Sequence, residues 1–114
     1  MGIQKTFSTK IGVDGNYIKC NEFDSVNVKS KTGLIKIKGY FSEASYNDNS
    51  DSLSEFQCPL GVGSKKKDVD GVLTQLDFDS VYGQSEEIID KFLVDNNFKI
   101  EFIAVVDLSD GIVL

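Results

Sequence analysis

The sequence contains no histidine, no tryptophan and no arginine, and all twelve of its cationic side chains are lysines. Without histidine, the chain lacks the side chain that most often transfers protons near neutral pH and the commonest metal ligand. Without arginine, it lacks the planar donor that binds carboxylates and phosphates through two parallel hydrogen bonds. These absences exclude Ser-His and Cys-His hydrolases and histidine-ligated zinc sites. We therefore expect a protein that is not an enzyme and that has no cofactor.

The chain also lacks long apolar runs and a cysteine framework. No stretch approaches the roughly 20 apolar residues of a membrane-spanning helix, and the residues after Met1 alternate instead of forming the apolar segment of a signal peptide. Cys20 and Cys58 are expected to be reduced, half-buried thiols. With 114 residues, 40% of them hydrophobic, residues 1–114 are expected to form a single soluble domain.

The formal net charge of −6 is unevenly distributed along the chain. Residues 1–38 carry seven lysines and three acids, whereas residues 68–114 carry eleven acids and two lysines. The net negative charge argues against nucleic acid or an anionic membrane as a partner, because lysine and arginine drive binding to both. Either the two ends solvate different faces of the domain, or the basic end of one subunit meets the acidic end of another.

Alternation of apolar and polar residues predicts strands in the first half of the chain. Asp14-Gly15-Asn16 and the Lys31-Thr32-Gly33 segment supply residues suited to tight turns. We therefore expect two antiparallel hairpins, one over residues 3–23 and one over residues 25–41.

Lysines alternate with apolar residues in the last of these strands. Lys36 and Lys38 share one face, and Ile35 and Ile37 share the other. Such a row of lysines is typical of the solvated side of an antiparallel sheet, and it discourages unwanted edge pairing. Lys36 and Lys38 are also our basic candidates for a subunit interface.

The second half of the chain mixes helical and strand patterns. Apolar residues at i, i+3, i+4 and i+7 predict a short helix over about 69–78. Ser85 and the two glutamates after it are typical of a helix start, and they predict a helix over about 86–95. Residues 98–108 alternate again and are expected to form one central strand. The loops expected between these elements include a polar loop at 42–52 and a flexible connector at 61–68.

These elements together predict the fold class. We expect an α+β domain in which five or six antiparallel strands form the sheet and one or two short helices pack on it.

Two pairs of acidic residues are candidate metal ligands. Asp68 and Asp70, like Asp77 and Asp79, are closely spaced, but the glycine and glutamate positions of an EF-hand loop are not matched. The glycines of residues 61–65 also lack the spacing of a phosphate-binding loop. We therefore expect no metal site and no small-molecule ligand. We take Asp77 and Asp79 as helix caps and as acidic interface candidates.

The chain ends with the apolar residues Ile112, Val113 and Leu114. Burial of apolar surface contributes about 25 cal/mol per Å², which a tail left in water would forgo. We expect these residues to form either a final edge strand of this domain or a strand added to a neighbour's sheet. They are the third group of interface candidates.

The order of features over about residues 1–80 carries a resemblance. Residues 1–7 lead through Tyr17-Ile18-Lys19 into a lysine-alternating strand that ends at Tyr40, and a polar loop and Cys58-Pro59 follow. In this order the chain resembles the small β-rich proteins encoded in the virion-structure regions of tailed bacteriophage genomes. The resemblance implies a structural or accessory role in a tail, baseplate, fibre attachment or head surface. It also implies assembly in the host cytoplasm, a place in the virion, and other protein subunits as partners.

Three functions remain open at this point. The first is a non-enzymatic structural subunit of a phage particle. The second is a small acidic inhibitor, such as a phage anti-defence protein that occupies a basic nucleic-acid groove of a host protein through residues 68–114. The third and least favoured is an enzyme with an acid-based site.

Overall fold

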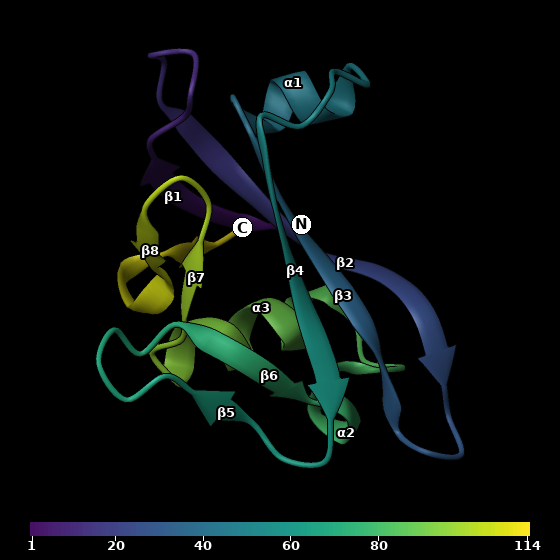
Figure 1. The fold of residues 1–114 in the computed structure, drawn as a ribbon. Coiled ribbons are helices and arrows are strands. Elements are labelled where there is room, and N and C mark those ends of the chain that lie inside the picture. Colours follow the sequence, from purple (N-terminus) through teal and green to yellow (C-terminus); the bar gives the residue numbers. More distant parts are fainter.

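The longest strands of the protein form the middle of a curled seven-stranded sheet, seen in a computed structural model that describes residues 1–114 (Figure 1). The strand order is β5-β6-β4-β3-β2-β1-β9, and β7 and β8 form a separate two-stranded sheet. The strands are β1 (Ile3–Phe7), β2 (Gly15–Asn27), β3 (Thr32–Tyr40), β4 (Ser54–Gly61), β5 (Lys65–Lys66), β6 (Leu73–Asp77), β7 (Lys99–Glu101), β8 (Val105–Asp107) and β9 (Ile112–Val113). The helices are α1 (Glu43–Asn47), α2 (Phe78–Val81) and α3 (Glu86–Asp95), with a 3₁₀ turn, η1 (Leu108–Asp110), before β9.

The prediction of a β-rich domain with few helices is confirmed, but the predicted sheet had too few strands and no parallel pair. The large sheet has seven strands instead of five or six, and β4 and β6 run parallel where an antiparallel sheet was expected. Two antiparallel hairpins are present, β1–β2 and β2–β3, but they share β2, because the strands expected to end at residue 23 and to begin at residue 25 form one continuous strand. The first is shorter than predicted because β1 ends at Phe7, which leaves Ile11 and Val13 exposed in a loop.

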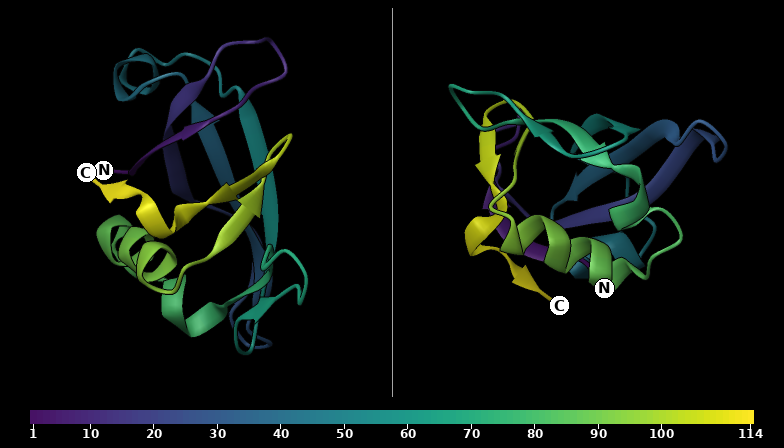
Figure 2. Two further views of the ribbon diagram at one scale, coloured as in Figure 1. Left: turned by 90° about the vertical axis from the view of Figure 1, so that its left-hand side faces the viewer. Right: turned by 90° about the horizontal axis from the view of Figure 1, so that it is seen from below.

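The inner face of the curled sheet packs against α3 and the β7–β8 hairpin, so the core lies between them (Figure 2). The residues that alternate along β3 divide as expected, since Ile35 and Ile37 are fully buried. Phe7 reaches across the inner face and lies over Gly15 and Gly39, where a Cβ atom would come within 2.1 Å and 2.4 Å of its ring. Glycine at these two positions therefore makes room for an aromatic ring in the core.

Helix α3 is confirmed over residues 86–95. The Ser85 hydroxyl accepts a hydrogen bond from the Ile88 N–H at 3.3 Å, and Glu86 and Glu87 lie in the first turn, where the helix dipole favours negative charge. Ile89 and Leu93 are buried as predicted. The apolar spacing of the helix predicts a buried stripe that also includes Ile88, but Ile88 is 49% exposed.

The helix predicted over residues 69–78 is wrong, because this segment forms β6 and the turn before it. Gly71 has φ +68°, a left-handed conformation that interrupts a right-handed helix. Residues 73–77 instead pair with β5 on one side and meet β4 on the other. Tertiary pairing thus overrode the helical spacing. Residues 61–68 are also not merely a connector, since Lys65 and Lys66 form β5.

The single strand predicted over residues 98–108 is a hairpin. The chain reverses at residues 102–104, where the Phe102 N–H donates to the Ala104 carbonyl at 3.1 Å. Ile100 pairs with Val106, so residues of the same parity face each other across the turn. A three-residue loop preserves the alternation, and the sequence pattern of this hairpin therefore equals that of one continuous strand. The predicted polar loop at 42–52 likewise contains a short helix, α1.

The basic beginning and acidic end of the chain fold against each other. Lys5 pairs with Asp110 at 2.5 Å, Lys31 pairs with Asp79 at 2.7 Å, and Lys19 pairs with Glu86. Three of the seven lysines in residues 1–38 are therefore paired with acids of residues 68–114 in the same chain.

Candidate functional site

The sheet has an open edge along the first six residues of β4. On the side of β3, β4 is paired from Ser54 to Leu60, which is all of the strand except its last residue. On its other side, β4 is paired only at Leu60 and Gly61, with β6. Figure 1 shows the two strands close at their carboxyl ends and diverging from there. Residues 54–59 therefore have a sheet partner on one side only.

Local chemistry explains why β6 pairs only with the last two residues of β4. Pro59 has no backbone N–H, and proline is tolerated mainly on strand edges. Beyond it, the Gln75 side chain donates hydrogen bonds to the carbonyls of Val62 at 3.2 Å and Gly63 at 2.7 Å, which holds the β4–β5 turn. β6 then pairs with β5, and the segment ahead of it touches β7 through a single bridge between Val72 and Lys99.

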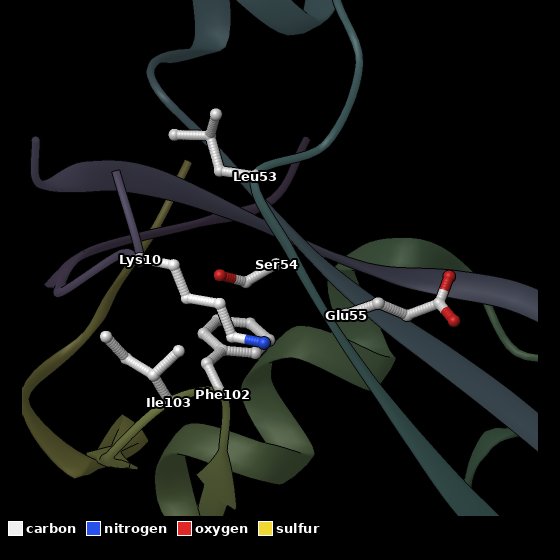
Figure 3. Close-up of a pocket in the computed structure, with 6 residues that line it drawn as sticks. All are labelled: Lys10, Leu53, Ser54, Glu55, Phe102 and Ile103. Atoms are coloured by element: carbon white, nitrogen blue, oxygen red, sulfur yellow. The ribbon is translucent and has the colours of Figure 1, made fainter. Parts of the chain in front are cut away.

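A cavity of about 220 Å³ lies in this opening (Figure 3). Its walls come from three separate segments: the β1–β2 loop, the start of β4 and the turn of the β7–β8 hairpin. Phe102 contributes an aromatic wall, and its ring packs edge-on against Phe7 with 4.9 Å between ring centroids. The lining residues are Lys10, Leu53, Ser54, Glu55, Phe102 and Ile103.

Of the two charged residues that line the cavity, Lys10 has no partner within the chain and Glu55 has two. Lys10 is exposed and forms no ion pair within the chain. Glu55 accepts a hydrogen bond from the Gln57 side chain at 2.9 Å and lies 4.0 Å from the Lys38 ammonium. The site thus offers an apolar wall, one unpaired ammonium and a free backbone edge. This combination suits an apolar side chain that is accompanied by a carboxylate.

The interface candidates Lys36 and Lys38 already have partners on the outer face of the sheet. The Lys38 ammonium lies 2.8 Å from the Glu22 carboxylate and donates a hydrogen bond to it. This hydrogen bond is the main reason why the pKa of Lys38 is raised. Lys36 lies 3.8 Å from Glu22 and 4.0 Å from Asp24. These two lysines and the acids of β2 form a row of exchangeable surface pairs, which contribute little stability each.

The candidates Asp77 and Asp79 are likewise engaged within the chain, at the start of α2. The Asp77 carboxylate accepts hydrogen bonds from the Ser80 hydroxyl at 2.7 Å and the Gly63 N–H at 2.8 Å, and these bonds lower the pKa of Asp77. Asp79 pairs with Lys31 in the β2–β3 turn. Neither aspartate lies near the cavity beside β4, whose walls come from other segments.

The apolar tail forms β9, the edge strand of the large sheet. Ile112 pairs with Gln4 and Val113 with Ile3, and the Leu114 N–H donates to the Gly2 carbonyl at 2.9 Å. The chain therefore has the first of the two arrangements expected for the tail. Ile112 and Leu114 remain 58% and 41% exposed, and the outer side of β9 has no partner strand.

A second polar site lies where α3 packs on β2. Asp90 is fully buried, and neither carboxylate oxygen has a hydrogen-bond partner. Desolvation and, next, the charge of Glu86 raise the pKa of Asp90 to about 7. Lys19 pairs with Glu86 and also donates to the Met1 carbonyl at 2.9 Å. The Met1 amino group lies 3.8 Å from the Glu86 carboxylate. This cluster therefore holds the beginning of the chain against α3.

The two cysteines are free and fully buried, not half-buried as expected. Cys20 lies in β2 and Cys58 in β4, with β3 between them. Adjacent strands are about 4.8 Å apart, so the two Cα atoms are roughly 10 Å apart, beyond the reach of a disulfide. Burial raises the pKa of Cys58 to about 12 and also raises the pKa of Cys20.

These thiols are expected to be unreactive in the native protein. Because thiolate is the reacting form, burial and a raised pKa both suppress modification. We expect Ellman's reagent at pH 8 to modify neither cysteine in the folded protein and both in urea. A thiol that reacts within seconds under native conditions would contradict the burial of the two cysteine side chains.

The sequence interpretation missed the cavity beside β4 because its walls are far apart in the chain. Lys10, Ser54 and Phe102 share no spacing that a motif could capture. One signal was available, because Pro59 within an apolar strand pattern indicates an edge strand.

Comparisons with known proteins found no match to a family model, to a curated protein or to a solved structure. None of the helices has both the length and the apolar character needed to cross a membrane. No three Cys, Asp or Glu side chains converge in an arrangement that could hold a metal ion.

Proposed function

We propose that this chain is a non-enzymatic assembly protein that binds other protein subunits, as a structural component of a tailed-phage particle. The observation that carries the proposal is the opening beside β4, where a free backbone edge adjoins an apolar cavity. A partner segment that enters the opening can hydrogen-bond to the edge and bury a side chain against Phe102, in the manner of β-strand addition.

The phage setting rests on the resemblance of residues 1–80. On this resemblance we propose a role in a tail, baseplate, fibre attachment or head surface, with assembly in the host cytoplasm. The exposed side chains of Ile112 and Leu114 on the outer edge strand supply a second apolar contact for neighbours. Opposed charge plays the smaller part in this proposal, because lysines of the basic end are already paired within the chain.

The alternative function is that of an acidic inhibitor that occupies a basic groove of a host protein. It requires the acids of residues 68–114 to face solvent. Asp79, Glu86 and Asp110 are paired with lysines, and Asp90 is buried. The acidic surface is therefore smaller than the sequence suggests, and we rank this function second.

Mass spectrometry of purified particles of the phage that encodes the chain separates the two functions. An assembly subunit is expected at a fixed copy number that matches a symmetry of the particle. An inhibitor is expected to be absent from particles and to bind one host protein in a salt-sensitive way. Absence from the particles would contradict the assembly function.

Ser54→Lys is expected to reduce incorporation of the chain into particles by about tenfold or more, the equivalent of about 1.4 kcal/mol of binding energy. Ser54 lines the cavity, so a lysine there places an ammonium where the partner's apolar side chain would lie, and charges of this kind protect natural sheet edges. The matched control is Ser30→Lys, a serine exposed in the β2–β3 turn and outside both β4 and the cavity lining. Equal incorporation of both variants, measured by quantitative mass spectrometry, would rule out the opening as the contact.

A further inference from the structure

We propose that the cavity beside β4 receives the turn at residues 67–71 of a second copy of this chain, with Val69 as the inserted side chain. This inference rests on the proposed assembly function and identifies the partner. Val69 is 93% exposed, more than any other large apolar side chain of the protein. An apolar side chain in that position is fully solvated in the isolated chain and gains from burial in a partner.

The turn that carries Val69 is held in one shape. The Gly71 N–H donates to the Lys67 carbonyl at 2.9 Å, and the Lys67 N–H donates to the Val72 carbonyl at 3.0 Å. Gly71 adopts the left-handed conformation that the turn requires, with φ +68°. Because the turn is preformed, binding through it costs little ordering entropy.

Charge on the turn is complementary to charge at the cavity. Asp68 and Asp70 flank Val69, and together with Lys67 they give the turn a net charge of −1; none of the three forms an ion pair within the chain. At the cavity, Lys10 has no ion-pair partner, whereas the other charged lining residue, Glu55, lies 4.0 Å from Lys38. With Val69 against Phe102 and Ile103, the two carboxylates of the turn are carried toward the ammonium of the partner's first loop. The contact thus matches apolar with apolar and negative with positive.

The backbone of the two surfaces is complementary as well. The N–H groups of Asp68, Val69 and Asp70 make no backbone hydrogen bond within the chain. Residues 54–59 of β4 leave one side of their backbone unpaired. The turn and the cavity are separate parts of one chain, so the contact joins different surfaces of two copies. Repetition of such a contact gives a ring or a filament, both of which suit a phage particle.

Sedimentation equilibrium of the purified chain over a wide concentration range tests this contact. The unmodified protein is expected to associate as concentration rises, with an average mass above that of the monomer. Val69→Ser removes the inserted side chain, and Lys10→Glu repels the acidic turn; each variant alone is expected to stay monomeric. Val62→Ser and Lys29→Glu are the matched controls, since Val62 is 77% exposed on another turn and Lys29 is also without an ion pair.

A mixture of the two disabled variants gives the sharpest outcome. Val69→Ser retains an intact cavity, and Lys10→Glu retains an intact turn, so an equimolar mixture is expected to form pairs that grow no further. A monomeric parent protein, undiminished association of Val69→Ser, or equal loss in the two controls would each overturn the inference. Such a failure leaves the assembly function intact if the chain is found in particles, because the partner is then a different protein. Absence from particles together with association in solution would instead defeat the proposed function alone.

Discussion

Asp90→Asn is expected to stabilise the protein by an amount that grows with pH, from near zero at about pH 4 to about 4 kcal/mol above pH 7. The parent carboxyl has its pKa raised to about 7 in the folded state, against an ordinary value of 3.8. Between these two values the folded protein holds a proton that the unfolded chain has released. Stability of the parent therefore falls as pH rises through this window, and asparagine removes that loss.

The contacts of Asp90 explain the direction of the shift. Both carboxylate oxygens are buried and have no hydrogen-bond partner, so ionisation would place an unsolvated charge between α3 and β2. Glu86, one turn earlier on α3, adds a like charge, and it is opposed by Lys19 and by the amino group of Met1. Tyr17 and Cys20 on β2 complete the titratable groups that face the carboxyl, and the pKa of each is raised, chiefly by burial.

Urea unfolding of parent and variant at pH 4.5, 6 and 8 measures the effect. Asp95→Asn is the matched control, because Asp95 lies on the same helix but is exposed, and its replacement is expected to change stability by only a few tenths of a kcal/mol. Parallel stability curves for the parent and Asp90→Asn across this range would show that Asp90 is solvated or paired in solution.

The parts of the fold that were predictable from sequence are those whose signals are local. Helix α3 carries a capping serine, acids in its first turn and a buried stripe, all within residues 85–95. The β6 segment had helical spacing, but the partners that made it a strand lie in β4 and β5. The β7–β8 hairpin was missed for another reason. Its loop has three residues, and a loop with an odd number of residues keeps the alternation that a straight strand would have. In addition, no glycine, proline or asparagine marks the turn at residues 102–104.

The candidate site was less predictable than the fold. Its cavity exists because β4 lacks a neighbour along residues 54–59, and pairing of this kind depends on the path of the whole sheet. For the apolar tail, the sequence indicated an edge strand of this domain as one of two expected arrangements, and this is the one found. It could not show that Lys38, Asp77 and Asp79 are satisfied within the chain, because their partners are distant in sequence or on other elements.

Gly39→Ala is expected to destabilise the protein by about 3 kcal/mol, toward the upper end for overpacking of a core. Gly39 lies on the inner face of β3, where an added Cβ would be 2.4 Å from Cζ of Phe7 and 3.0 Å from Cε2 of Phe102. Both rings must shift, and Phe102 is also a wall of the cavity beside β4. The same substitution should therefore weaken the proposed assembly contact as well as stability, with urea unfolding as the primary measurement.

The sign of the Gly39 effect separates steric crowding from backbone preference. In a strand, alanine is ordinarily more favourable than glycine by roughly 0.5–1 kcal/mol, because glycine loses more conformational freedom on folding. Destabilisation by Gly39→Ala must therefore come from Phe7 and Phe102.

A smaller side chain at Phe7 relieves that crowding, so Phe7→Leu should cost less in the Gly39→Ala background than alone, with a coupling of about 1 kcal/mol or more. Gly63→Ala has φ +83° and no neighbouring atom, so it should cost backbone strain yet show no coupling to Phe7→Leu. Equal coupling at both glycines would mean that Phe7 does not lie over Gly39.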